Sequence, residues 1–326
     1  MKRRKLGRVG PEVSALGLGR MSLSGSYGRA RTAESLDAVA AAREAGIAFF
    51  DPAEAYGDGP TEELAARALG PERETGTRAT TVGLRLEGGR LEADGRPVNV
   101  RRAAEGSLRR LGVECIDLYY LHRRDPKVPI EETVGALAEL VDAGLVRWLG
   151  LSEVSATTLR RAHTIHPITA VQSEYSLWTR APADGVLAAC RELGVGFVPY
   201  CPLGRGFLTG RFPGRSALAE HDIRLSTPYF EEAHVDHNQR LARQWVALAK
   251  ELGATGAQLA LAWLLHQGPE IVPIFGTRRR SNLTENAAAA RLVLDEQTLS
   301  RIAELVPRGA ASGDSAPAVT AHLADR

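Results

Sequence analysis

Short apolar runs alternate along the chain with longer segments in which apolar residues recur every three to four positions. The runs have the length of buried strands, and the longer segments have the period of helices. Eight runs are present: SALGLG (14–19), IAFFD (47–51), RATTVG (78–83), IDLYYLH (116–122), VRWLGLS (146–152), ITAVQSE (168–174), GVGFVPY (194–200) and EIVPIFG (270–276). Because these runs are apolar almost throughout, they predict a parallel sheet that is buried on both faces.

The segments between the runs support the same arrangement. The clearest helical periodicity covers residues 34–45, 100–111, 131–143, 156–163 and 182–193. Four of these segments are followed by a glycine, which is typical where a helix ends in a left-handed residue: Gly46, Gly112, Gly144 and Gly194. Eight strand–helix units predict a closed (β/α)8 TIM barrel, and a doubly wound open sheet is the alternative with similar local signals. We expect one barrel domain over residues 1–326.

Three regions fall outside this repeat. Residues 1–13 have the pattern of a hairpin turned at 8–11, which we expect to plug the bottom of the barrel. Residues 204–235 are rich in Gly, Pro, Arg and His, and they predict a long functional loop after the seventh strand. The tail 308–326 is rich in small residues, and we expect it either to be mobile or to lie over the barrel mouth.

Composition narrows the classes of function. The chain has 326 residues, of which 44% are hydrophobic, and a net charge of +2, so we expect a full core and no general attraction to nucleic acid. No run approaches the roughly 18 apolar residues of a membrane-spanning helix, and the basic start lacks the apolar segment of a signal peptide. Three widely spaced cysteines favour a reducing cytoplasm over disulfides. We expect a cytoplasmic protein. The His163/His166 and His234/His237 pairs have no nearby cysteine or acidic third ligand, so we expect no metal, and homo-oligomer formation stays open.

Candidate chemistry is concentrated where the predicted strands end. TIM barrels carry their catalytic residues at the C-terminal ends of the strands and in the loops that follow. The side chains at those positions are Arg20, Asp51, Glu54, Tyr56, Thr81, His122, Ser152, Gln172, Glu174, Tyr200 and Cys201. Taken singly, Asp51 fits a helix cap and His122 fits a core histidine. Their convergence with Tyr56 on one barrel mouth favours a catalytic centre, in which a desolvated Asp51 needs a cation nearby.

Six ordered motifs resemble those of the aldo-keto reductase family. The string FFDPAEAYG resembles the family's FFDTAxxYG, IDLYYLH resembles IDLYxxH, and GLVRWLGLSEVS resembles GKVRxIGLSxxS. The strings AVQSEYSLW, PLGRGFLTGRF and IVPIFGTRRRSNLTENAAAA also match, and the resemblance runs from about Arg4 to Leu305. It is closest to bacterial members with the VQSEYSLWTR and PLGRGFLTG motifs.

The resemblance implies that Asp51, Tyr56 and His122 are three members of a catalytic tetrad. In the family, the tyrosine donates a proton to the carbonyl oxygen while the nicotinamide delivers a hydride to the carbon. The histidine orients the carbonyl, and a lysine paired with the aspartate lowers the pKa of the tyrosine. This chemistry needs an acid at the oxygen because the carbonyl becomes an alkoxide.

The fourth member of the tetrad is replaced. Where the family reads ATKFG, this chain has Thr81 in place of the lysine, and no lysine occurs between Lys5 and Lys127. Where relatives read GLGCM, it has Arg20. Arg20 is the leading candidate for the missing positive charge, although an arginine cannot act as the acid. Lys127 and Arg85 are weaker candidates.

Three functions are compatible with this change. In the first, Arg20 compensates and the protein is still a carbonyl reductase. In the second, the site reduces a polarised C=C or C=N bond, or catalyses a non-redox step on a secondary metabolite. In the third, the protein binds the cofactor with little turnover, as a sensor or structural partner.

Two segments resemble a dinucleotide-binding site. PLGRG (202–206) offers small residues whose backbone approaches a pyrophosphate, and GTRRR (276–280) precedes a helix whose Asn282 and Glu285 fit a capping box. Three guanidinium groups suit a 2′-phosphate, so we expect NADPH rather than NADH. By resemblance, Glu285 and Asn286 contact adenine, Ser152 and Gln172 contact the carboxamide, and Tyr200 stacks on the nicotinamide. The remaining expected cofactor contacts are Cys201, Leu203, Gly204, Arg205, Gly206, Gly276, Thr277, Arg278, Arg279 and Arg280.

Substrate-binding segments are expected around 22–29, 85–98 and 211–235 and at Trp178. Within and beside them, Trp178, Tyr229 and Phe230 predict an aromatic-lined pocket for a flat or cyclic substrate.

Overall fold

Eight parallel strands form the central sheet of the computed structural model, which describes residues 1–19, 21–23, 25–28, 31–51, 60–70, 76–87 and 90–325. Along the sheet the order is β11-β10-β9-β8-β5-β4-β3-β12. The bounds are β3 (Gly17–Gly19), β4 (Phe49–Asp51), β5 (Thr77–Val82), β8 (Ile116–Leu121), β9 (Val146–Ser152), β10 (Ile168–Glu174), β11 (Gly196–Tyr200) and β12 (Ile274–Phe275). Each of the eight predicted runs matches one of these strands, and only β5 begins outside its run, one residue earlier at Thr77.

Backbone hydrogen bonds join the two ends of the sheet. The Phe197 nitrogen on β11 donates to the Glu270 oxygen at 2.9 Å, and the Val272 nitrogen donates to the Phe197 oxygen at 2.8 Å. Since the segment containing these two partners leads into β12, the sheet closes on itself. The (β/α)8 barrel is therefore confirmed over the open sheet.

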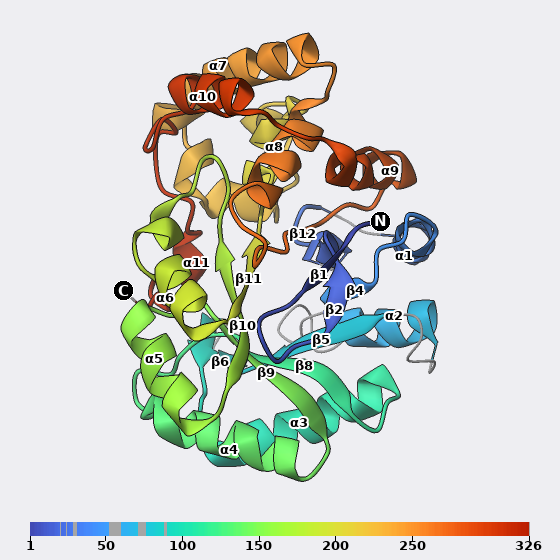
Figure 1. Ribbon diagram of the computed structural model, residues 1–326, viewed down its shortest axis with the longest axis vertical. Helices are drawn as coiled ribbons and strands as arrows, with labels where there is room; N and C mark the ends of the chain where they lie inside the picture. Colours follow the sequence, from blue (N-terminus) through green and yellow to red (C-terminus); the bar gives the residue numbers. More distant parts are fainter. Residues whose placement is uncertain are drawn as a thin grey trace.

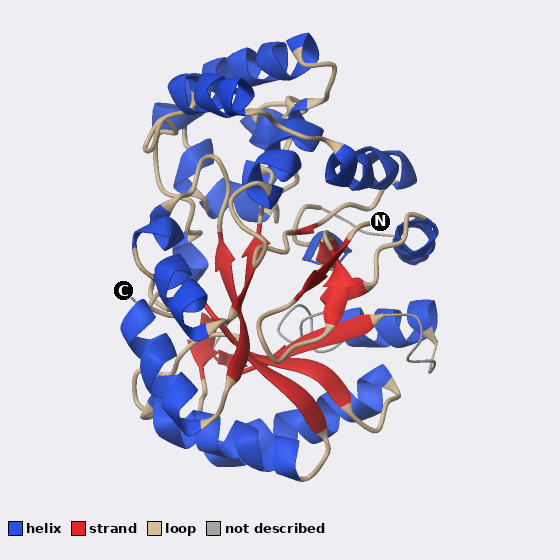
Figure 2. Cartoon of the chain, viewed as in Figure 1, coloured by secondary structure: helices blue, strands red, loops and turns tan. Residues whose placement is uncertain are grey.

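Helices surround the strands (Figures 1 and 2). Their bounds are α1 (Thr32–Glu44), α2 (Pro60–Leu69), α3 (Pro97–Leu111), α4 (Ile130–Asp142), α5 (Ala156–Ile165), α6 (Val186–Leu193), α7 (Glu232–Glu251), α8 (Gly256–Leu265), α9 (Arg280–Ala288), α10 (Glu296–Leu305) and α11 (Ala318–Ala321). The helices predicted from periodicity are confirmed to within a few residues at their ends. Gly112 and Gly194 follow α3 and α6 with φ of 65° and 70°, a conformation that lets the chain turn into the next strand. Among the described helices, none is long and apolar enough to cross a membrane.

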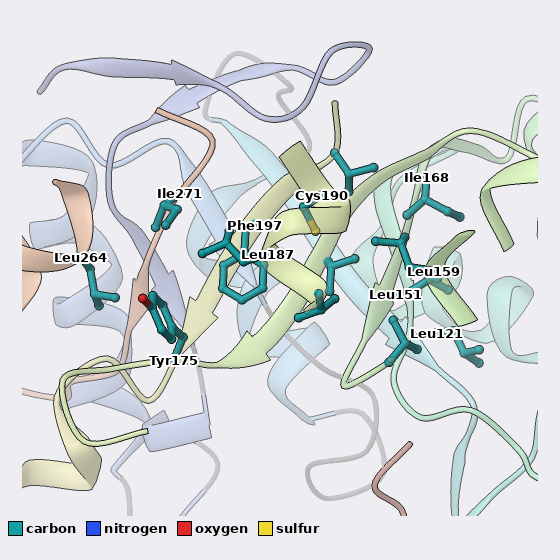
Figure 3. Packing of buried hydrophobic residues seen from close by; sticks show 14 of the residues in the cluster. Leu121, Leu151, Leu159, Ile168, Tyr175, Leu187, Cys190, Phe197, Leu264 and Ile271 are labelled. Carbon is teal, nitrogen blue, oxygen red and sulfur yellow. The ribbon is translucent and has the colours of Figure 1, made fainter. Parts of the chain in front are cut away.

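The main hydrophobic core lies between the strands and the helices. Figure 3 shows Leu121, Leu151 and Phe197 of the sheet beside Leu159 of α5 and Leu187 of α6. Each of these five side chains is at most 4% exposed. Burial of one such side chain stabilises a fold by about 1.5–3 kcal/mol, so this layer holds the helices against the barrel.

The first strands close the bottom of the barrel. β1 (Arg3–Lys5) and β2 (Glu12–Ser14) form the predicted antiparallel hairpin. Leu6 is fully buried among interior barrel residues such as Phe49 and Leu118. The hairpin does not cover the opposite end of the barrel, where the parallel strands end, so that end can hold a functional site.

Two regions after strands add to that end. After β5, β6 (Leu84–Glu87) and β7 (Arg90–Ala93) form a hairpin. The loop predicted over 204–235 ends earlier than expected, because α7 begins at Glu232, and it contains short 3-10 turns. These are η4 (Gly204–Thr209), η5 (Arg215–Ala217), η6 (Ile223–Ser226) and η7 (Pro228–Phe230). Elsewhere in the described residues, 3-10 turns include η1 (Met21–Leu23), η3 (Ala181–Asp184) and η8 (Ala289–Arg291).

The C-terminal tail lies against this end of the barrel. Asp325 accepts hydrogen bonds from the Ser155 nitrogen at 3.0 Å and from its hydroxyl at 3.2 Å, and it pairs with Arg124 at 3.3 Å. His322 Nε2 contacts the Leu91 carbonyl oxygen on β7 at 3.0 Å. The tail therefore lies over the barrel mouth, which is one of the two arrangements that we expected from the sequence.

Candidate active site

A cavity of about 550 Å³ opens at the C-terminal ends of the strands. Its size is in the usual range for small-molecule sites. Most of the residues expected from the sequence line it: Asp51, Thr81, His122, Ser152, Gln172, Tyr200, Cys201, Leu203, Arg205, Gly206, Gly276, Thr277, Arg278, Arg279, Asn282 and Asn286. Gly204, Arg280 and Glu285 do not line it. Arg20, Glu54 and Tyr56 lie outside the described residues.

Asp51 ends β4 and faces the cavity. Its side chain is buried, and Oδ2 accepts a hydrogen bond from Gln172 Nε2 on β10 at 2.7 Å. Because β4 and β10 are separated by three strands in the sheet order, this bond crosses the barrel mouth. The carboxylate of Asp51 therefore belongs to the site.

Thr81 occupies the strand between Asp51 and His122. It lies on β5, where it is paired in register with Tyr120 of β8, and it is 3% exposed. Its hydroxyl has no hydrogen-bond partner within the described part of the chain. A neutral side chain at this point cannot supply the positive charge that a lysine would bring beside Asp51.

His122 follows β8 and is also buried. Its backbone nitrogen donates to the Val82 oxygen at 2.7 Å, which fixes it at the end of the strand. Burial lowers the pKa of His122 to about 3, and the positive charge of Arg123 acts in the same direction. His122 is therefore neutral near pH 7 and can donate one hydrogen bond without carrying charge.

The cation beside His122 is Arg123, which sequence reasoning missed. Its side chain lines the cavity, and Nη1 donates to the His122 oxygen at 2.7 Å and to Ser152 Oγ at 3.1 Å. Lys127 and Arg85, the weaker substitutes for the lysine, do not line the cavity: Lys127 is exposed, and Arg85 pairs with Glu87 and Asp94. The signal that could have identified Arg123 is its position directly after His122, the histidine at the end of β8.

A buried ion pair supports the loop after β11. Arg205 Nη2 lies 2.7 Å from Glu174 Oε2, and both side chains are less than a tenth exposed. Burial raises the pKa of Glu174 to about 7, against the opposing effect of Arg205. Arg205 and Cys201 both have positive φ, at 50° and 48°, so the loop holds two residues in a conformation that side chains disfavour. Burial also raises the pKa of Cys201 to about 11, which keeps it a thiol.

The arginine cluster before α9 divides between the cavity and the outside. Arg278 donates to the Gly28 oxygen at 2.9 Å and to the Tyr27 oxygen at 3.2 Å, while Arg279 lines the cavity. Arg280 instead pairs with Asp37 and Glu44 of α1. Because helical residues turn by about 100° each, the first residue of α9 faces its neighbour helix. Two of the three expected arginines therefore line the cavity.

The predicted capping box at Asn282 is wrong. Arg279 is the N-cap of α9 and makes no side-chain cap, so Asn282 and Glu285 lie within the helix. Their side chains accept hydrogen bonds from Arg211, at 3.0 Å and 2.7 Å. Arg211 lines the cavity after η4 and is a second cation that sequence reasoning missed.

The three residues predicted as an aromatic lining of the pocket do not line it. Trp178, Tyr229 and Phe230 are at most 4% exposed and pack with Phe207 in a cluster that does not line the cavity. Aromatic side chains bury large apolar areas, so they serve here to hold the loop after β11 against α7. Other residues form the apolar and aromatic lining, including Met21, Tyr27, Leu84, Leu91, Tyr200, Phe275, Pro317 and Val319.

Comparisons with known proteins agree with this geometry. The chain is 46% identical over 317 residues to the probable aldo-keto reductase 1 of Glycine max, covering 95% of this chain and 90% of that protein. Its structure is similar to the glycerol dehydrogenase AKR11B4 from Gluconobacter oxydans, with a TM-score of 0.84 and 26% identity over 93% of this chain and 94% of that one. It is also similar to the thermostable aldo-keto reductase Tm1743 in complex with the inhibitor epalrestat, with a TM-score of 0.74 and 31% identity over 94% and 100% of the two chains.

The match to the family as a whole covers the barrel. Residues 15–307 fit the Aldo/keto reductase family, whose members are oxidoreductases that use nicotinamide cofactors. This range includes all eight barrel strands and every cavity residue that belongs to one of the sequence motifs. The cavity residues of the C-terminal tail lie outside it. This chain therefore belongs to the aldo/keto reductase family.

Proposed function

We propose that this protein is an NADPH-dependent reductase of carbonyl groups on small molecules, and that residues 1–326 act as one barrel domain. The observation that carries the proposal is a single cavity that joins Asp51 and His122 to Arg279 at the start of α9. One end holds a carboxylate and a neutral histidine, and the other holds a cation and a helix N-terminus. This polarity suits a dinucleotide whose phosphates lie at one end and whose reactive ring lies at the other.

The donors and acceptors at the catalytic end fit the carboxamide of a nicotinamide. Ser152 Oγ already accepts a hydrogen bond from Arg123, so its own hydrogen is available to the carboxamide oxygen. Gln172 uses Nε2 on Asp51, so its Oε1 is available to the carboxamide N–H. At the other end, a Cβ atom at position 276 would lie 3.0 Å from Ser22 Oγ. A glycine at this position therefore lets its backbone lie close to Ser22 in the cavity wall.

The chain's own residues have separate tasks in this proposal. When bound, reduced nicotinamide supplies the hydride to a carbonyl carbon. His122 donates a hydrogen bond to the carbonyl oxygen, and Tyr56 gives that oxygen its proton. The hydrogen bond from Gln172 to Asp51 connects β10 to β4 across the mouth of the barrel. Thr81 leaves Tyr56 without the charge that would make it a stronger acid, and Arg20 is our candidate for the compensating cation.

The replacement of a lysine by Thr81 favours a second candidate function. A site with a weakened acid can retain the cofactor while reducing carbonyls slowly, or can serve a polarised C=C or C=N bond or a non-redox step. Cofactor binding does not depend on Thr81 in either case, because the groups that hold the dinucleotide come from other strands.

Oxidation of NADPH by the purified protein tests the first function. We expect a fall in absorbance at the nicotinamide band with 9,10-phenanthrenequinone and with simple aldehydes, and a loss of that turnover in Arg20→Ala. Tight NADPH binding without turnover would favour the second candidate. A protein that does not bind NADPH at all would contradict both.

Replacing Arg279 with glutamine is expected to weaken NADPH binding by about 10–100-fold, because a hydrogen bond to a charged group contributes about 1.5–3 kcal/mol. The affinity for NADH, which lacks the 2′-phosphate, should change by less than about threefold. Quenching of tryptophan fluorescence measures both dissociation constants. Arg280→Gln is the matched control, since Arg280 pairs with Asp37 and Glu44 outside the cavity. Equal losses in the two variants would exclude a specific role for Arg279.

A further inference from the structure

Arg123 is one of several arginines that line the cavity. Three of the others are each ion-paired with a carboxylate at 2.7 Å: Arg205–Glu174, Arg211–Glu285 and Arg224–Asp222. Arg123 is 9% exposed, and its two hydrogen bonds go to neutral oxygens, the His122 carbonyl and the Ser152 hydroxyl. Within the described residues it forms no ion pair. A mostly buried cation that has no ion-pair partner favours the binding of an anion at the edge that it leaves open.

Arg123 lines the cavity, and one edge of its guanidinium is open to solvent. Both hydrogen bonds of Arg123 use Nη1, and neither Nε nor Nη2 donates to a described residue or is sealed from solvent. Glu153, the residue after Ser152, is not within ion-pair distance of Arg123, and its Oε1 accepts a hydrogen bond from the Glu174 nitrogen at 2.7 Å. Two parallel N–H groups on one edge match the two oxygens of a carboxylate.

The position of Arg123 sets where such an anion would lie. The residue follows His122 directly, and its bond to Ser152 directs the guanidinium toward β9, away from Thr81 on β5. It therefore does not replace a lysine beside Asp51. A carboxylate on Arg123 would instead lie beside the group that binds the carbonyl oxygen at His122, with Leu84 and Leu91 available to the apolar part of the ligand.

We propose that Arg123 binds a carboxylate of the substrate, so that this reductase prefers carbonyl compounds with a carboxylate next to the carbonyl, such as 2-oxo acids. The proposal rests on the proposed carbonyl reduction and adds the substrate class. In the reaction the carbonyl carbon gains a hydride from the reduced nicotinamide, the oxygen gains a proton, and the carboxylate is unchanged. The product is a 2-hydroxy acid and oxidised NADP⁺.

Binding of an unreactive carboxylate tests the anion site without turnover. Calorimetric titration with benzoate and with neutral benzamide, with and without NADP⁺, should show at least about tenfold preference for benzoate. Arg123→Gln, which keeps a hydrogen-bond donor without the charge, should remove that preference and leave benzamide binding within about threefold. Arg124→Gln is the matched control, because Arg124 pairs with Asp325 and does not line the cavity. Unchanged benzoate binding in Arg123→Gln, or no preference in the original protein, would overturn the proposal.

Kinetics with a matched pair of substrates separates this proposal from the proposed function. The ratio of kcat/KM for phenylglyoxylate to that for its methyl ester should fall about 10–100-fold in Arg123→Gln and less in Arg123→Lys, which keeps the charge. Equal losses for acid and ester would mean that Arg123 acts only through Ser152, which contradicts the anion site. Selective benzoate binding without any carbonyl reduction would contradict the proposed function and leave the anion site supported. Thermal unfolding of each variant verifies that it is folded.

Discussion

Replacing Thr81 with lysine is expected to raise the turnover number for simple aldehydes and quinones by about 100-fold or more. General acid catalysis typically contributes about 10²–10⁴-fold, and the proposed acid, Tyr56, lacks a neighbouring cation from β5. Thr81 lines the cavity on the strand between those of Asp51 and His122, so a lysine there enters the site beside a carboxylate. The carboxylate would keep the ammonium group charged despite its burial. Steady-state rates at saturating NADPH measure the effect.

Methionine at position 81 is the matched control for that experiment. It has a similar length to lysine and no charge, so any gain from filling the space beside Asp51 would appear in Thr81→Met as well. A rise confined to the lysine variant would identify the missing charge as the limiting feature. A folded Thr81→Lys protein that binds NADPH and is no faster than the original would show that another group already supplies the charge, or that the site serves a different reaction.

Loss of Arg205 is expected to destabilise the protein by about 3–5 kcal/mol, because Arg205→Met leaves Glu174 buried without its partner. The pair joins the end of β10 to the loop after β11, so the change should also loosen the wall of the cavity. The free energy of unfolding in urea measures the effect. Arg280→Met is the control, since it breaks two exposed ion pairs whose loss should change the free energy of unfolding only slightly.

The penalty should also depend on pH. Burial already raises the pKa of Glu174 to about 7, and removal of the opposing arginine raises it further. A carboxyl whose folded pKa lies above its unfolded value of about 4.3 stabilises the fold below that unfolded value and loses this contribution as pH rises. Arg205→Met should therefore be less destabilised at pH 5 than at pH 8. The double variant Arg205→Met/Glu174→Met should recover most of the stability; a double variant as unstable as the single one would show that Arg205 acts by packing alone.

The sequence alone predicted eight parallel strands because each strand is buried on both faces, and it favoured a barrel. The hydrogen bonds from Phe197 to Glu270 and Val272 decided between a closed barrel and an open sheet. Apolar runs such as 116–122 and 194–200 cannot be confused with half-exposed strands, and the glycines after the helices mark where the chain reverses. For the same reason it predicted which residues end the strands, so Asp51, Thr81, His122 and Ser152 reach one mouth as expected. The replacement of the lysine is visible at this level, since it depends only on position along β5.

The directions of the side chains were decided only by the tertiary structure. Arg279 and Arg280 are neighbours in an arginine run, yet one lines the cavity and the other pairs with α1, because the helix begins between them. Trp178 was predicted to line the pocket and is instead a core residue, because the loop after β11 folds back onto it. Arg123 became a candidate only when β9 brought Ser152 to its guanidinium. Such contacts join residues far apart in the chain, and local pattern carries no information about which partner a long side chain finds.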